Sequence, residues 1–488
     1  MERDQANCGL RASDAANSCT LTRHGSDGRL DPVGDGAMDF CAIVVLGCWG
    51  LAMRTVRGNL TVGLVLLLLC GSAVAQGAGR TGSDSFGAPG AWKQLAKLTE
   101  ASGKSQDWLG WSVAVSKDGS TVAVGAVGWC PQQGFDGCGQ GAIFVFVKPT
   151  SGWTDMTETG LLNASDGRPG DYLGESLAIS DDGGTIVAGS PGWPANGHDN
   201  GALYVFLKPT NGWVNGVETA RLTATDTDTN LGQSVAISGA TIIGGAQYFN
   251  GEQGAAYVFV EPQTGWSNMT QTARLTPSDG KGGYMGDSVA ISGNTVVAGA
   301  PITGVGGAGN GTYLFVKPKN GWKNRTETAK LTPSRGTDLG LGYAVSVIDS
   351  TVAVGADRRS NHNGAIYVYV KPSSGWRSMT ETARLTVPPK FNVLGFSVFS
   401  DSDGRSIVGG APGWQDGGGQ GSAVLFVKPV TGWRTTSSFT SRLTAADGKN
   451  PDSLGYSVAA TTNVIASGAP FAQIGANTEE GAAYVFGR

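Results

Sequence analysis

Residues 285–301 decide the fold: Met285-Gly286-Asp287-Ser288-Val289, the polar turn Ser292-Gly293-Asn294, and the apolar run Val296-Val297-Ala298-Gly299-Ala300-Pro301. After a Gly-rich loop come Gly311-Thr312-Tyr313-Leu314-Phe315-Val316 and then Lys317-Pro318-Lys319-Asn320-Gly321-Trp322. Short apolar runs bounded by Gly, Asn and Pro are typical of β-strands joined by tight turns. The Ser-Gly-Asn turn between two such runs predicts a β-hairpin.

The same unit recurs seven times. The Leu-Gly-x-Ser-Val-like step begins at residues 109, 173, 231, 285, 341, 394 and 454, and the Gly-Ala-x-Tyr-Val-Phe-like run begins at 141, 201, 254, 311, 364, 421 and 481. Six copies continue into Gly-Trp, with Trp at 153, 213, 266, 322, 376 and 433. Each unit predicts four short strands, A to D, and a lone sheet of this size cannot bury both faces. Stacking such sheets around an axis predicts an all-β fold, a seven-bladed β-propeller of four-stranded blades over residues 90–488.

The two ends of the chain predict how the ring closes. The last copy stops at Arg488, directly after its third strand, and lacks the Gly-Trp and Arg-Leu-Thr segments. A matching segment, Trp92–Thr99, stands at the start of the repeats. We therefore expect this N-terminal strand to be the outer strand of the last blade, paired with Gly481–Phe486.

These repeats resemble the FG-GAP repeat family, whose best known members are the N-terminal β-propellers of integrin α-subunits. The resemblance covers residues 90–488 and implies a propeller that serves binding or adhesion. In many members a long acidic A–B loop holds calcium, but the A–B connections here are too short for that. The acidic residues precede strand A instead, at Asp166, Asp171, Asp226, Asp228, Asp279, Asp447 and Asp452. Calcium there would need six to eight oxygen ligands in one loop, so we favour turn chemistry and expect no cofactor, with calcium as the less favoured alternative.

Composition excludes several classes of function. The 488 residues contain 78 Gly, 35 Lys and Arg, and 39 Asp and Glu, for a net charge of −4. That balance provides no basic footprint for nucleic acid. The three His residues leave little material for a His-built metal site.

The first 89 residues are expected to be a leader and a linker. Residues 1–52 have no predicted fold and are either disordered or added by a mis-assigned start. Residues 53–75 combine a basic stretch, an apolar run and Ser72-Ala73-Val74-Ala75, which are the parts of a secretory signal. We expect cleavage after Ala75, a linker at 76–89, and secretion. The alternative is an uncleaved signal anchor at the cell surface, the one case in which a membrane would be a partner.

Two further features fit export. Cys130 and Cys138 lie in one Gly-rich loop and are expected to form a disulfide, rather than two free thiols or a zinc site that lacks other ligands. Sequons for N-glycosylation stand at Asn163, Asn268, Asn310 and Asn324.

Strand direction sorts the loops between two faces, which we name the DA/BC face and the AB/CD face after the strands that their loops join. The AB/CD face carries the regular Gly-Trp turns, whose Trp side chains we expect to be structural rather than a sugar-stacking ladder. The DA/BC face carries irregular loops, where binding residues concentrate on a rigid scaffold. The candidate ligand-binding residues are Trp129, Trp193, His198, Asp199, Tyr248, Phe249, Glu252, Asp357, Arg358, Arg359, His362, Trp414 and Asp416. For each aromatic side chain, packing within its own loop is the competing interpretation.

Three classes of function remain. We favour a secreted or cell-surface binding module that recognises an extracellular protein or glycan through the DA/BC face. The second is a carbohydrate-active enzyme using two carboxylates among Asp199, Asp357, Asp416 and Glu252, although no spacing selects a pair. The third is a structural component of a wall or matrix.

Overall fold

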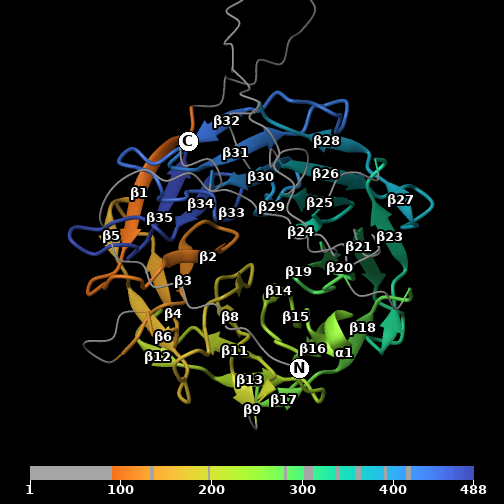
Figure 1. Ribbon diagram of the computed structural model, residues 1–488, viewed down its shortest axis with the longest axis horizontal. Helices are drawn as coiled ribbons and strands as arrows, with labels where there is room; N and C mark the ends of the chain where they lie inside the picture. Colours follow the sequence, from red (N-terminus) through yellow and green to blue (C-terminus); the bar gives the residue numbers. More distant parts are fainter. Residues whose placement is uncertain are drawn as a thin grey trace, which may run out of the picture. The chain divides into compact units, whose positions relative to one another are not determined.

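Seven antiparallel sheets stand around a common axis as the blades of a β-propeller (Figure 1). This computed structural model describes residues 91–131, 137–195, 198–279, 283–301, 311–335, 340–357, 364–388, 393–413 and 419–488, with the backbone alone at 194, 195, 198 and 199. All of them belong to the unit Asp84–Arg488. In this part of the chain, helix is confined to α1 (Phe249–Glu252). The predicted all-β fold is confirmed.

Each blade contains strands A to D, counted from the axis outward. Blade 1 contains β2 (Leu109–Val115), β3 (Thr121–Ala126), β4 (Ala142–Val147) and β6 (Gly160–Asn163), and blade 2 contains β7 (Leu177–Ile179), β8 (Thr185–Ser190), β11 (Ala202–Leu207) and β13 (Ala220–Thr223). Blade 3 contains β14 (Ser234–Ser238), β15 (Thr241–Ala246), β16 (Ala255–Val260) and β18 (Ala273–Thr276), and blade 4 contains β19 (Ser288–Ser292), β20 (Thr295–Ala300), β21 (Gly311–Val316) and β23 (Ala329–Thr332). Blade 5 contains β24 (Leu341–Ile348), β25 (Thr351–Ala356), β26 (Ala365–Val370) and β28 (Ala383–Leu385), and blade 6 contains β29 (Val398–Ser400), β30 (Ser406–Ala411), β31 (Ser422–Val427) and β32 (Ser441–Leu443). Blade 7 contains β33 (Ser457–Ala460), β34 (Val464–Ala469), β35 (Ala482–Gly487) and β1 (Lys93–Thr99).

Short strands from the C–D connections tie neighbouring blades together. Each runs parallel to the outer strand of the preceding blade, which gives five sheets a fifth strand. These strands are β5 (Met156–Thr157), β12 (Gly216–Val217), β17 (Met269–Thr270), β22 (Arg325–Thr326) and β27 (Met379–Thr380). One further pair, β9 (Pro194–Ala195) and β10 (His198–Asp199), forms a hairpin within the B–C loop of blade 2.

The N-terminal strand closes the ring as predicted. Strand β1 pairs antiparallel with β35, with Lys93 opposite Gly487 and Lys97 opposite Tyr484. A register shift between Gln94 and Ala96 interrupts the pairing. The last blade is therefore built from both ends of the repeat region, which Figure 1 shows as an orange strand beside a blue one.

The apolar core is divided into clusters that lie between blades. Leu98 and Val485 of blade 7, for example, pack with Val113 and Phe144 of blade 1. Corresponding clusters join each of the other neighbouring pairs of blades among the described residues. Each sheet thus buries its faces against its neighbours, as a stack of units too small to fold alone requires.

The repeated Leu-Gly-x-Ser and Gly-Ala motifs form the seams between blades. In blade 4 the Ser288 hydroxyl donates a hydrogen bond of 2.7 Å to the Gly342 carbonyl of blade 5. The same carbonyl lies 1.9 Å from where a Cβ on Gly299 would stand. Only glycine fits so close an approach. Equivalent Ser-to-Gly contacts cross five other seams, including Ser457 to Gly110, where the ring closes.

The turns of the AB/CD face repeat the same hydrogen bonds from blade to blade. In blade 1 the Lys148 amide donates to the Ser120 carbonyl of the A–B hairpin, and the Gly152 amide donates to Pro149 at a φ of 102°. The indole of Trp153 donates to the Gly119 carbonyl. All six Trp residues of the Gly-Trp turns are 3–9% exposed, so their structural role is confirmed and the sugar-stacking alternative is wrong.

Candidate functional site

The candidate residues of the DA/BC face divide into packed and exposed side chains. Trp193 donates its indole N–H to Asp166, and the Arg221 guanidinium lies 4.6 Å from its ring centroid. Phe249 lies in the same way against Arg274, at 4.7 Å. Contacts with other segments of their own blades therefore account for both aromatic side chains: Arg221 lies in β13 and Arg274 in β18.

The next three candidates fall in two places, with Trp129 in blade 1 and with Tyr248 and Glu252 together beside Tyr284 in blade 3. Trp129 packs against the cluster between blades 7 and 1, beside a disulfide that joins Cys130 and Cys138 with Cα atoms 5.8 Å apart, as predicted. Tyr248 is 41% exposed and makes an edge contact with Tyr284. The carboxylate of Glu252 accepts a hydrogen bond from the Tyr284 hydroxyl.

The remaining candidates are one buried carboxylate and residues whose side chains lie outside the described part of the chain. Asp357 is buried. Only the backbone of His198 and Asp199 is described, and Arg358, Arg359, His362, Trp414 and Asp416 lie outside the described residues. Among the carboxylates offered for catalysis, the side chains of Glu252 and Asp357 are thus the described ones.

The acidic residues before strand A bind protein groups. The Asp226 carboxylate accepts hydrogen bonds from the Tyr257 hydroxyl and from Arg274. Asp166, Asp279 and Asp447 each bridge a Tyr and a cation of their blade in the same way. Asp171 and Asp452 cap turns by accepting from the backbone amides of Arg168 and Lys449. Among the described residues, no group of three or more His, Cys, Asp or Glu side chains is placed to hold a metal ion.

A contiguous cluster of side chains surrounds the axis where the A strands begin. Its members occupy the x position of the Leu-Gly-x-Ser step in six blades. We call this set the axial cluster: Tyr343, Phe396, Tyr456, Trp111, Glu175 and Gln233. Neighbouring blades contribute rings with centroids 5.0 Å apart for Tyr343 and Phe396, 4.9 Å for Phe396 and Tyr456, and 4.7 Å for Tyr456 and Trp111. All six side chains are half-buried.

The row of rings from Tyr343 through Phe396 and Tyr456 to Trp111, which we call the arc, ends at the carboxylate of Glu175. Glu175 accepts hydrogen bonds from the side chains of Trp111 and Gln233. Burial raises the pKa of Glu175 to about 7, although both hydrogen bonds favour the ionised form. Blade 4 places Asp287 at the same repeat position. The axial cluster therefore contains aromatic rings on one side of the axis and the polar side chains of Glu175 and Gln233 on the other.

A second set of residues lies directly before the Leu-Gly-x-Ser step in six of the seven blades, and blade 5 has Gly340 there. Trp108, Tyr172, Asn230, Tyr284, Val393 and Ser453 all have φ between 50° and 62°. Such backbone is rare for bulky residues and costs about 1 kcal/mol or more at each position. Trp108 also contacts Trp111, with ring centroids 6.0 Å apart, and Tyr172 is 42% exposed. Left-handed backbone thus places the Trp108 ring against the axial cluster.

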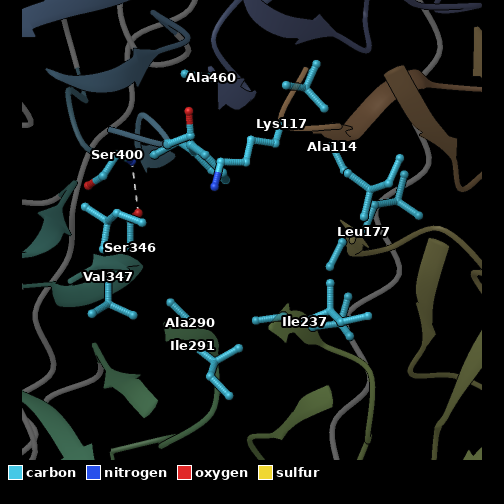
Figure 2. A pocket seen from close by; sticks show the side chains of 18 of the residues that line it. Ala114, Lys117, Leu177, Ile237, Ala290, Ile291, Ser346, Val347, Ser400 and Ala460 are labelled. Carbon is cyan, nitrogen blue, oxygen red and sulfur yellow. Dashed lines mark hydrogen bonds between the residues drawn. The ribbon is translucent and has the colours of Figure 1, made fainter. Parts of the chain in front are cut away.

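A channel of about 320 Å³, lined mainly by the A strands, lies along the axis of the propeller. Figure 2 shows Ala114, Leu177, Ile237 and Ala290 around it, with Lys117 reaching over the opening at the A–B hairpins. The Lys117 ammonium lies 3.4 Å from the Asp181 carboxylate. The axial cluster and the A–B hairpins therefore lie at opposite ends of the channel.

The sequons differ in exposure. Asn268 and Asn324 are exposed, and each side-chain carbonyl caps a backbone amide of the preceding blade, at Arg221 and Arg274. Asn163 is half-buried in β6. Asn310 lies outside the described residues.

Sequence reasoning missed the axial cluster because it searched the long B–C loops. The signal was nevertheless present: six of the seven steps keep Gly and Ser, while x is Trp, Glu, Gln, Asp, Tyr, Phe or Tyr. A position that varies inside a repeated motif, next to positions fixed by packing, marks a surface free to specialise.

Fold and seams together define a β-propeller made of seven copies of one unit. The model of the FG-GAP repeat matches residues 92–146, 156–206, 217–259, 269–315 and 438–486, about half of the chain. The protein therefore belongs to the FG-GAP repeat family. No curated protein matches it significantly. Among the described residues, no helix is long and apolar enough to cross a membrane.

Proposed function

We propose that this propeller is a secreted or cell-surface binding module that recognises an extracellular protein or glycan through its DA/BC face. The axial cluster is the centre of the proposed site. The observation that carries the proposal is the continuous chain of contacts from Tyr343 to Gln233, contributed by six blades at one repeat position.

The chemistry of the axial cluster suits an amphipathic ligand. Aromatic rings contribute large contact areas at low entropic cost and stack on the apolar faces of sugars or side chains. Glu175 and Gln233 add acceptors and donors that would orient polar groups of the ligand. Aromatic residues enriched at one spot, with polar groups at its rim, are typical of binding surfaces.

The test compares the full chain with two variants on a glycan array and in capture of extracellular proteins. Phe396→Ala/Tyr456→Ala removes the middle of the arc, and Glu175→Gln removes the charge without changing the shape. We expect both variants to lose the ligands of the parent, while Val430→Ala, at a fully exposed turn of the opposite face, keeps them. Identical ligand profiles for all four proteins would contradict the proposal. A generic glycosidase screen tests the enzyme alternative, for which we expect no turnover.

A further inference from the structure

The C–D turns of the AB/CD face carry cations unevenly around the ring. In blades 4 to 6 these turns span residues 317–323, 371–377 and 428–434 and contain seven Lys and Arg residues and no Asp or Glu. The cations are Lys317, Lys319, Lys323, Lys371, Arg377, Lys428 and Arg434, which we call the basic crescent. The corresponding turns of blades 1 to 3 contain Lys148 and Lys208 as their cations, and blade 3 has Glu261 in the same position.

The fold does not require this asymmetry. The residue after the buried Trp is Lys323, Arg377 or Arg434 in blades 4 to 6, but Thr154, Val214 or Ser267 in blades 1 to 3. The turns themselves have the same structure in all six blades, because each closes a Gly-to-Pro hydrogen bond and joins the neighbouring A–B hairpin. The extra cations are therefore not needed to form the turns.

The basic crescent faces solvent. Six of its seven residues are exposed and Lys317 is half-buried. Within the described part of the chain none of them forms an ion pair; Arg377 donates to the Ser374 hydroxyl. The A–B hairpins of blades 5 and 6 carry three acidic residues on this face: Asp349 is exposed and its amide donates to the Ser292 hydroxyl, Asp401 caps the Arg405 and Ser406 amides, and Asp403 accepts from Thr462. The crescent thus contributes a local positive field on a protein whose net charge is −4.

We propose that the basic crescent binds an acidic polysaccharide, a chain that carries carboxylate or sulfate groups at regular intervals. Cations repeated from blade to blade match a ligand whose charges repeat along its length. This site lies on the face opposite the axial cluster and does not depend on the proposed function. A propeller with both sites would hold its ligand while anchored to an anionic matrix.

Two other polyanions fit the crescent less well. Single-stranded nucleic acid is normally bound with exposed aromatic side chains that stack on bases. The aromatic residues of these turns are Trp322, Trp376 and Trp433, which are 6%, 9% and 7% exposed. An anionic membrane surface is normally bound with apolar anchors as well as charge, and Val430 is the single fully exposed apolar residue among these turns.

The experiment uses two matched charge reversals in the full chain. Lys371→Glu/Lys428→Glu changes the crescent, and Lys148→Glu/Lys208→Glu changes the same repeat position in blades 1 and 2. Binding to immobilised polygalacturonate and chondroitin sulfate is measured, with dextran as the neutral control. We expect the parent to bind both anionic chains and to weaken as salt rises, because salt screens exposed charges. The crescent variant should bind about tenfold or more weakly, and the control variant within about twofold of the parent.

Two further measurements separate this site from its rivals. Arg377→Ser/Arg434→Thr installs residue types found in blades 1 to 3 and should weaken binding while leaving the thermal midpoint unchanged. Phe396→Ala/Tyr456→Ala should bind polysaccharide as the parent does. The proposal would be overturned by no salt-sensitive binding, by equal losses in the two charge reversals, or by tighter binding to phosphatidylserine vesicles or an oligothymidylate than to either polysaccharide.

Discussion

The seams and the axial cluster are formed by neighbouring residues of one motif, yet the seam residues are nearly constant among the seven repeats and the axial residue varies. At the seams, Ser of the Leu-Gly-x-Ser step donates to the next blade, Gly accepts from the preceding one, and both residues barely vary. At the axial cluster, the x residue between them changes from blade to blade. One short motif can therefore serve two purposes, because packing fixes Gly and Ser and leaves the residue between them free to contact a ligand.

A side chain that blocks the close approach of two backbone segments at a seam should destabilise the fold. A Cβ on Gly410 would lie 1.9 Å from the Gly455 carbonyl of the next blade. Since that neighbour is backbone and cannot move aside, we expect Gly410→Val to destabilise the fold by about 4 kcal/mol or more and to reduce soluble yield. The measurement is thermal unfolding followed by circular dichroism.

The matched control for this variant is Gly216→Ala. A Cβ there meets its nearest atom, the Val214 carbonyl oxygen, at 4.0 Å. We expect a change of less than about 0.5 kcal/mol. Equal effects of the two substitutions would show that the seam is no more sensitive than a loosely packed edge strand.

Substitutions in the axial cluster should abolish ligand binding while changing the stability of the fold only slightly. Phe396 and Tyr456 are half-buried, so Phe396→Ala/Tyr456→Ala leaves the seam contacts in place and should lower the thermal midpoint by only a few degrees. We expect surface plasmon resonance to show ligand binding by the parent and none by the folded variant. A variant that unfolds at room temperature would instead assign these rings to the core.

A smaller effect is expected where one seam hydrogen bond is removed. Ser288→Ala deletes the donor to the Gly342 carbonyl and should cost about 1 kcal/mol. Blade 5 provides the control, because Ala344 already stands at this position. Ala344→Ser should be neutral or stabilising in the same denaturation assay, whereas a loss equal to that of Ser288→Ala would contradict a general role for this hydroxyl.

The last prediction concerns pH. Burial raises the pKa of Glu175 from its ordinary value of 4.5 to about 7, so the folded state binds this proton more tightly than the unfolded chain does. The resulting stabilisation is complete below about pH 4.5 and is lost as pH rises through 7. Glu175→Gln should therefore raise the thermal midpoint relative to the parent at pH 8 more than at pH 4.5. A pH-independent difference between the two proteins would contradict this assignment.

The repeats made the fold predictable to an unusual degree. The blade count, the four strands and the exchange of Trp92–Thr99 into the last blade all followed from matching copies, because seven similar units leave few ways to bury their faces. The burial of Trp153 and its equivalents was also predictable, since their turns are identical in pattern. The fifth strands were not predicted, because two-residue pairings such as β5 with β1 leave no periodicity in the sequence.

The site was less predictable because side chains from separate blades compose it. Trp193 and Phe249 looked like ligand contacts in their irregular loops, yet Arg221 and Arg274 lie against their rings. Trp111 and Tyr456, by contrast, are 345 positions apart and meet only because the ring closes. Residue propensities and motif spacing predict contacts within one repeat, and they do not predict contacts between side chains of different blades.

We propose that the ligand binds at the axial cluster. Hydrogen–deuterium exchange on the full chain, with and without a ligand recovered by array or capture, locates the bound surface. We expect protection at residues 108–112, 173–176 and 454–457, where the A strands begin, and unchanged exchange at the Gly-Trp turns. Protection confined to the Gly-Trp turns, or to the outer strands alone, would contradict the claim.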